Sequence, residues 1–251
     1  MESCKNLFIP RLLPGDPPFR PASGRCDQKE FLECLAAQDY DLGANSPVKV
    51  DLPGGRSVYV QPGKEGGVYL LDATHMGILY DRRQVVGVCG DRGGQCRRAW
   101  KGMIMTQPAL TKINEVPVVL IPTYVPDTTE PAGLVALKIV VQDGAPRFEP
   151  FWQAPSVSSR EAVERFRDRP TRVAITQFQD EPYAWLVDDQ ENRSTIIGVR
   201  VRDGVITARE TMTGRVRHNI QPLIYEGMLY VPAYNGSSSW LEAYAIRGVD
   251  H

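Results

Sequence analysis

The residues of this chain that could do chemistry are few and widely spread. Asp39 and Asp41 form a D-x-D pair that could ligate a cation, but a hard cation needs six or more oxygen ligands and the pair supplies only two carboxylates. The acidic run of Asp188, Asp189 and Glu191 lacks the glycine and the terminal glutamate of a calcium loop. We therefore interpret both sets as solvated turns on the protein surface.

The histidines and the glycine-rich loop give no stronger signal. His75, His218 and His251 are far apart in the chain, so no pair has zinc-ligand spacing and none is placed for a Ser-His-Asp triad. The GDRGG segment at residues 90–94 is not followed by the G-K-[ST] of a phosphate-binding loop. A histidine metal site and a phosphate loop are therefore not expected.

Five cysteines allow one short disulfide. Cys89 and Cys96 enclose a six-residue, glycine-rich segment, which suits a disulfide hairpin better than a zinc knuckle if the compartment is oxidising. Because the number of cysteines is odd, at least one thiol is free or paired with another molecule.

The composition excludes several classes of partner. The chain has 251 residues and a formal net charge of -1, from 29 Lys and Arg against 30 Asp and Glu, so no overall field attracts nucleic acid. No apolar run approaches the roughly 18 to 20 residues of a membrane-spanning helix. The first 21 residues are too interrupted by Arg11 and prolines for a secretory signal. We expect a chain that spans no membrane, binds no nucleic acid and carries no export signal as written.

The elements that must position these residues are short β-strands. Residues 1–45 are irregular except for a predicted helix at 29–37, and a second short helix is predicted at 158–166. From Ser46 onward, apolar runs of four to eight residues are separated by turn signals such as GKEGG at 63–67 and QDG at 142–144, and the whole chain has 22 glycines and 20 prolines. Grouped in threes and fours, the runs repeat, and the third member of each group covers residues 68–72, 134–138, 196–200 and 241–245. This period predicts an all-β chain of propeller blades over residues 46–251, with a β-sandwich as the alternative.

One blade also resembles a known family. Residues 39–81 are similar to a blade of the quinoprotein dehydrogenase propellers, which use pyrroloquinoline quinone. The matching positions are Asp51, Gly55, Lys64, Gly66, Tyr69, Leu71, Asp72 and Gly77. The resemblance implies that Lys64 contacts the quinone, since an ammonium group stabilises the negative charge of the reduced cofactor. Asp41, in the D-x-D pair of the same blade, is the second candidate cofactor-binding residue.

The rest of the family's site is not found. Its calcium ligands, catalytic aspartate and adjacent cysteine pair come from blades upstream of this one, where this chain has about forty irregular residues. About four blades also cannot close the family's eight-bladed ring. We predict an incomplete or partner-completed quinoprotein-like propeller, and we interpret it as a binding or scaffold module without a complete active site. The alternative is a pyrroloquinoline quinone-dependent alcohol or sugar dehydrogenase, or part of one, with Ca²⁺.

The partner and compartment follow from the same resemblance. The expected partner is another protein chain or a second propeller half, because exposed blade edges invite association. The last blade has no outer strand of its own, and residues 6–12 are a candidate to complete it. Quinoproteins of this type work in the periplasm or outside the cell, so the resemblance implies that location.

Overall fold

The computed structural model describes residues 6–16, 30–37, 40–42, 45–85, 104–124, 133–156, 166, 169–189, 193–217 and 219–246. Within these residues, the chain is all-β apart from one helix, α1 (Phe31–Ala37). The helix begins two residues later than predicted and ends at the predicted residue. The second predicted helix lies outside the described residues except for Phe166. No helix in the described part of the chain combines the length and the apolar character needed to span a membrane.

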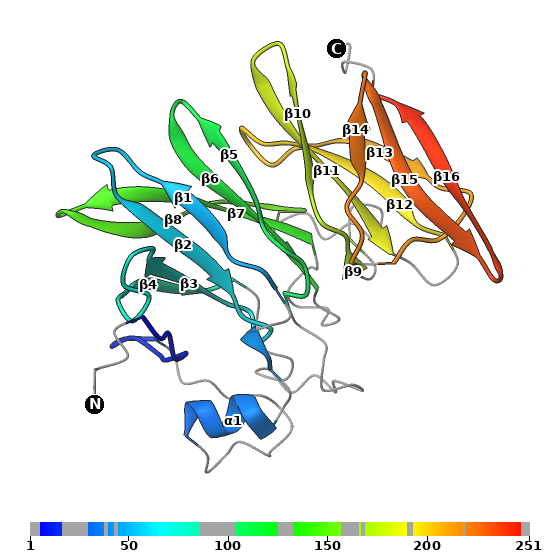
Figure 1. Cartoon of the computed structure of the whole chain (residues 1–251). Helices are drawn as coiled ribbons and strands as arrows, with labels where there is room; N and C mark the ends of the chain where they lie inside the picture. The colour runs from blue at the N-terminus through cyan, green and yellow to red at the C-terminus, as the bar shows by residue number, and fades with distance from the viewer. Residues whose placement is uncertain are drawn as a thin grey trace.

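The strands form four antiparallel sheets, each built from consecutive segments of the chain (Figure 1). Sheet 1 contains β1 (Val48–Asp51), β2 (Ser57–Pro62), β3 (Gly67–Asp72) and β4 (Leu79–Gln84). Sheet 2 contains β5 (Ala109–Ile113), β6 (Val116–Thr123), β7 (Gly133–Gln142) and β8 (Ala145–Ala154). Sheet 3 contains β10 (Ala174–Phe178), β11 (Glu181–Asp189), β12 (Thr195–Arg200) and β13 (Ile206–Thr211), and the short β9 (Arg169–Pro170) pairs with β11. Sheet 4 contains β14 (Leu223–Tyr225), β15 (Met228–Asn235) and β16 (Ser238–Ala245).

Two-residue turns set the register of several hairpins. The turns Asn114-Glu115, Asp143-Gly144, Gln179-Asp180 and Glu226-Gly227 have positive φ at both residues. Such a backbone matches the right-handed twist of the strands that it joins, so the flanking residues stay paired. The predicted QDG turn signal is one of these four, whereas the turns at 114–115 and 179–180 contain no glycine.

The sheets pack face to face in chain order, and three hydrophobic clusters fill the spaces between them. One cluster joins sheets 1 and 2, a second joins sheets 2 and 3, and a third joins sheets 3 and 4. Sheets 2 and 3 are therefore buried on both sides, so β6 has near-continuous apolar residues in place of an alternating pattern. Figure 1 shows the sheets side by side, with sheets 1 and 4 at opposite ends of the row.

The all-β class and the four groups of strands are confirmed. The four aligned segments fall in β3, β7, β12 and β16, the third strand of the main series in each sheet. Among the described residues, sheet 4 has three strands.

The prediction that residues 6–12 complete the last sheet is wrong. This segment lies against sheet 1, where the Phe8 ring is 5.0 Å from the Tyr69 ring in an edge-to-face arrangement. Arg11 Nη2 donates to the carbonyl of Gly77 at 3.4 Å, and Asp16 Oδ2 lies 3.2 Å from Arg82 Nη1. An aromatic ring and a buried cation on the outer side of sheet 1 therefore hold the segment there.

Candidate functional site

The two predicted cofactor-binding residues lie in contact. Lys64 is in the turn between β2 and β3, and its Nζ lies 3.6 Å from Asp41 Oδ2. The backbone N–H of Lys64 also donates to the carbonyl of Asp41 at 3.3 Å. The Lys64 side chain is 9% exposed, whereas that of Asp41 is 60% exposed. The structure therefore brings Asp41 against the turn that holds Lys64, whereas Asp39 lies outside the described residues.

Glycines shape this turn around a residue that sequence reasoning missed, Glu65. A Cβ at Gly63 would lie 2.0 Å from Glu65 Oε2, and one at Gly67 would lie 2.6 Å from Oε1. The Glu65 side chain therefore folds back over its own turn. It occupies the space that a Cβ atom at position 63 or 67 would fill. The glycines on both sides of Glu65 in GKEGG are the sequence signal that could have identified it.

Glu65 is a buried carboxyl group with one hydrogen-bonded oxygen. Tyr69 Oη donates to Glu65 Oε1 at 2.5 Å, whereas Oε2 has no hydrogen-bond partner among the described residues. Burial raises the pKa of Glu65, against the opposing effects of the Tyr69 hydrogen bond and the Arg82 charge. Burial likewise raises the pKa of Tyr69, and the neighbouring Glu65 raises it further. These two groups favour their neutral forms in the folded chain.

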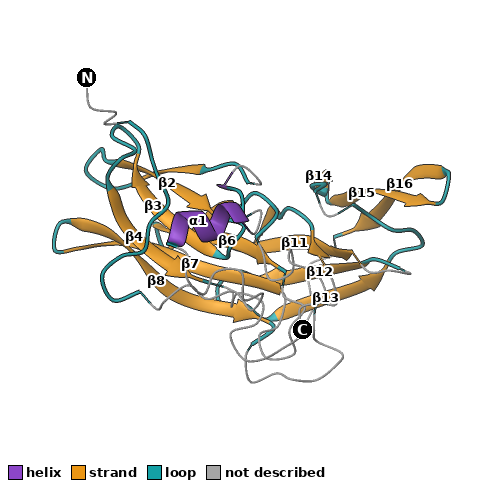
Figure 2. Cartoon of the chain, turned by 90° about the horizontal axis from the view of Figure 1, so that it is seen from below, coloured by secondary structure: helices purple, strands orange, loops and turns teal. Residues whose placement is uncertain are grey.

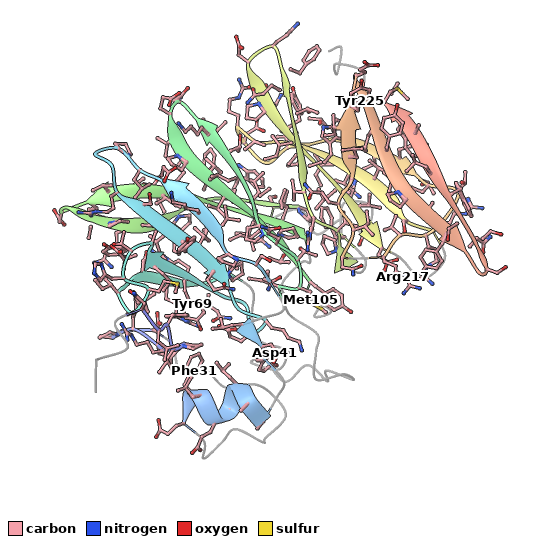
Figure 3. All side chains as sticks on the ribbon, viewed as in Figure 1. Phe31, Asp41, Tyr69, Met105, Arg217 and Tyr225 are labelled. Atoms are coloured by element: carbon pink, nitrogen blue, oxygen red, sulfur yellow. The ribbon has the colours of Figure 1, made fainter. Side chains whose placement is uncertain are left out.

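Arg82 connects this turn to the N-terminal segment. Arg82 is only 3% exposed, and its Nη2 donates a hydrogen bond to Gln84 Oε1 at 2.7 Å. The Cζ atom of its guanidinium lies 5.5 Å from the centroid of the Tyr69 ring and 5.8 Å from that of the Phe31 ring. Residues 6–16 and α1 therefore cover the outer side of sheet 1. Figure 3 shows Tyr69, Phe31 and Asp41 on this side, and in Figure 2, seen from below, α1 lies in front of the sheets.

The described residues do not fit a quinone with Ca²⁺. The ammonium of Lys64 already faces a carboxylate of its own chain, and its side chain is largely buried. No group of three His, Cys, Asp or Glu side chains that could hold a metal ion occurs among the described residues. The contacts between Lys64 and Asp41 are those of a structural ion pair.

Two further predictions on side chains have different outcomes. The interpretation of Asp188 and Asp189 as surface residues is wrong, because they are 0% and 8% exposed. The two residues form the end of β11 and pair with the short β9. Asp189 Oδ1 also lies 3.5 Å from Arg215 Nη2. The predicted Cys89–Cys96 disulfide lies outside the described residues. Cys34, which is 1% exposed, is disulfide-bonded.

A groove of about 540 Å³ runs along the junction of β4 and β8. Its charged residues join the two sheets, because Asp81 Oδ2 accepts the N–H of Phe148 at 2.8 Å. Arg147 Nη1 donates to the carbonyl of Tyr80 at 2.9 Å, and Arg83 Nη2 donates to the carbonyl of Phe148 at 3.3 Å. This groove is a hydrogen-bonded seam between sheets 1 and 2, and it lacks the convergent free groups of a reactive site.

The second candidate site is the outer face of sheet 4, on the side away from sheet 3. Strand pairing places its members in cross-strand rows. They are Leu223, Tyr225, Met228, Tyr230, Pro232, Tyr234, Ser239, Leu241, Ala243 and Ala245. Leu223, Tyr225 and Leu241 are 65%, 60% and 60% exposed. Because no described element covers these side chains, sheet 4 presents an apolar surface at the end of the row (Figure 1).

A carboxylate network fixes the position of this face. Glu242 points to the opposite side of sheet 4, where it accepts hydrogen bonds from the backbone N–H groups of Thr213 and Gly214 and from Trp240 Nε1. Thr213 Oγ1 and Tyr244 Oη also donate to it. Burial alone would raise the pKa of Glu242, but these hydrogen bonds lower it to about 2.

Comparison with known proteins adds no relative. No protein-family model matches the chain, and no curated protein matches it. The quinoprotein resemblance therefore stays a prediction from the sequence.

Proposed function

We propose that this chain is a binding or scaffold module without a complete active site of its own, built from four blades of a partial β-propeller. The observation that carries the proposal is the uncovered apolar outer face of sheet 4. A contiguous apolar surface is unfavourable to leave in contact with water, and on folded proteins such a surface often marks a site of protein-protein contact.

The arrangement of the sheets supports the propeller interpretation. Consecutive antiparallel strands in each sheet and face-to-face packing of successive sheets are typical of propeller blades. In a closed propeller, each blade is covered on both sides by its neighbours. Here sheets 2 and 3 meet that condition, sheet 1 is covered by residues 6–16 and α1, and sheet 4 is covered on one side. Another protein chain that packs on sheet 4 would supply the missing cover.

The compartment we propose is the periplasm or the outside of the cell. A disulfide at the buried Cys34 is the kind of bond that persists in an oxidising compartment. This inference agrees with the location that the quinoprotein resemblance implies.

The test separates a binding surface from an enzyme. The full chain is first dialysed against pyrroloquinoline quinone with Ca²⁺ and assayed for dye reduction with alcohols and sugars. We expect neither stoichiometric binding nor turnover. Stoichiometric quinone binding that Lys64→Ala abolishes would overturn the proposal.

A positive measurement uses a fluorescent probe of apolar surface. The folded chain is expected to bind the probe, and Leu241→Asp or Tyr225→Asp is expected to reduce its fluorescence. Val141→Asp is the matched control, because Val141 is an apolar strand residue that is 51% exposed on β7, away from sheet 4. Equal fluorescence from all four proteins would show that sheet 4 is not an accessible apolar site.

A further inference from the structure

We infer that the occupant of the outer face of sheet 4 is a second copy of this chain, related to the first by a two-fold axis that lies in the interface, perpendicular to β15. This inference rests on the proposed function and names the partner at the same surface. It follows from the charge pattern of the face, from its size and from the covering of sheet 1.

The face is apolar along its strands. Glu242 is the one charged residue of β14, β15 and β16, and it points to the opposite side, toward Thr213 and Gly214. Two such faces can therefore meet without burying an unpaired charge or placing like charges opposite each other along the strands. A self-complementary patch of this kind is what a two-fold dimer requires.

The charges at the two ends of the face have opposite signs. At one end, the exposed Arg217 places its guanidinium 5.3 Å from the centroid of the Tyr234 ring. At the other end, the exposed Glu226 is in the turn between β14 and β15, next to Tyr225. The nearby Arg215 already lies 3.5 Å from Asp189 of its own chain. Figure 3 shows Arg217 and Tyr225 toward opposite ends of sheet 4.

This polarity selects the orientation of the second copy. A two-fold axis perpendicular to β15 reverses the strand direction, so it lays the Arg217 end of one copy over the Glu226 end of the other. Because the operation is symmetric, the oppositely charged pair occurs twice, once at each end of the interface. A parallel stacking of the faces would place Arg217 over Arg217 and Glu226 over Glu226, which is unfavourable.

The size of the face suits a modest dimer. Six of its ten outward residues are Leu, Met or Tyr, and each partner buries about 800 Å² in a standard interface. A patch confined to one three-stranded sheet is at the small end of such interfaces, so we expect the dimer to dissociate on dilution, which makes its Kd measurable.

The other end of the molecule does not offer an equivalent surface. Head-to-tail packing would place sheet 4 of one copy on the outer side of sheet 1 of the next. On that side Tyr69, Leu71 and Arg82 are 0%, 3% and 3% exposed, because residues 6–16 and α1 lie over it. Pairing of sheet 4 with sheet 4 requires no such displacement.

The first experiment measures the mass of the full chain in solution by sedimentation and light scattering over a range of concentrations. We expect a concentration-dependent species of twice the 28.0 kDa chain mass. Leu241→Asp and Tyr225→Asp are expected to leave only the monomer, with unchanged circular dichroism. The control Val141→Asp is expected to dimerise like the wild type.

The second experiment tests the orientation by charge reversal. Arg217→Glu and Glu226→Arg are each expected to raise the dimer Kd by about tenfold, since each change affects two symmetric pairs at the rim. The double variant, which restores opposite charges, is expected to recover most of the wild-type Kd. The double variant is also the control for misfolding. If a single change raised the Kd by damaging the fold, the second change would not restore the wild-type Kd.

Several outcomes would overturn the inference. A wild-type chain that stays monomeric at 28.0 kDa while its probe fluorescence still depends on Leu241 would reject the second copy and leave the proposed binding function intact. A dimer insensitive to Leu241→Asp and Tyr225→Asp would place the contact elsewhere. Charge-reversed single variants that are not rescued by the double variant would reject the antiparallel orientation. Quinone-dependent turnover would reject the proposed function itself, whatever the oligomeric state.

Discussion

Glu242 Oε1 accepts a hydrogen bond of 2.9 Å from the backbone N–H of Gly214, so a carboxylate of β16 caps the loop that follows β13. The same carboxylate accepts the backbone N–H of Thr213 at 3.1 Å. Gly214 must be small for this approach, because a Cβ there would lie 2.7 Å from the Trp240 ring. Sheet 4 is therefore attached to sheet 3 by a hydrophobic cluster and by one fully hydrogen-bonded carboxylate.

We expect Glu242→Gln to destabilise the chain near neutral pH. The pKa of Glu242 is lowered to about 2, so its stabilising effect is present above the unfolded value of 4.5 and is lost as the pH falls toward 2. The expected loss in the free energy of unfolding at pH 7 is roughly 2–3 kcal/mol. Urea unfolding between pH 2.5 and 7 would measure it.

The control for this prediction is Glu33→Gln, at an exposed residue of α1 away from sheet 4. It is expected to change the free energy of unfolding by less than ~0.5 kcal/mol. A Glu242→Gln curve that runs parallel to the wild-type curve down to pH 2.5 would contradict the assigned role of the ionised carboxylate.

Glu65→Gln is predicted to have the opposite pH dependence. Burial raises the pKa of Glu65 above its unfolded value, so the folded state favours the protonated form. The stability linked to this group is complete below the unfolded pKa of about 4.5 and is lost as the pH rises through the folded pKa. The glutamine variant retains an acceptor for Tyr69 and does not ionise. Its advantage over the wild type should therefore grow from pH 4 to pH 8.

Thermal unfolding of both proteins across this range tests the prediction. Glu65→Ala serves as a second variant, because it removes the ionisable group and also the side chain that fills the space between Gly63 and Gly67. Wild-type stability that rises relative to Glu65→Gln between pH 4 and pH 8 would mean that the carboxylate is ionised and paired in the folded chain.

The sequence predicts the sheets better than it predicts the polar residues. Residues 118–121 of β6 are all buried, because sheet 2 is covered on both faces. Such burial requires apolar residues at successive positions, and this pattern is visible in the sequence. Asp188 looks like a turn residue because its surroundings in the sequence are acidic, yet the contacts that bury it come from residues far away in the chain. Glu65 was missed for the same reason, since residues 6–16 help to cover its neighbours Tyr69 and Arg82. The sequence indicates both Lys64 and Asp41 as site residues, and only their mutual contact in the structure shows that they form an ion pair.

The Lys64–Asp41 pair is predicted to contribute little to stability. The distance of 3.6 Å and the 60% exposure of the Asp41 side chain are typical of pairs worth less than about 1 kcal/mol. A double-mutant cycle with Lys64→Met, Asp41→Asn and the double variant isolates this coupling energy. The Lys64→Met change alone should cost little more than the coupling, because methionine keeps the buried alkyl chain. A coupling energy above 3 kcal/mol would show that the pair is an essential part of the fold.

The packing of the N-terminal segment, residues 6–16, against sheet 1 is predicted to depend on Phe8. The edge-to-face contact between Phe8 and Tyr69, with ring centroids 5.0 Å apart, is worth about 0.5–1.5 kcal/mol in addition to the apolar area it buries. Phe8→Ala should therefore loosen residues 6–16, and trypsin should cleave after Arg11 faster than in the wild type. Leu7→Ala is the matched control, because Leu7 is 55% exposed and its loss should leave the cleavage rate unchanged. Since sheet 4 is at the far end of the row, Phe8→Ala should also leave the mass in solution unchanged. A Phe8→Ala chain that forms larger, open-ended assemblies would instead show that the segment blocks head-to-tail packing on sheet 1.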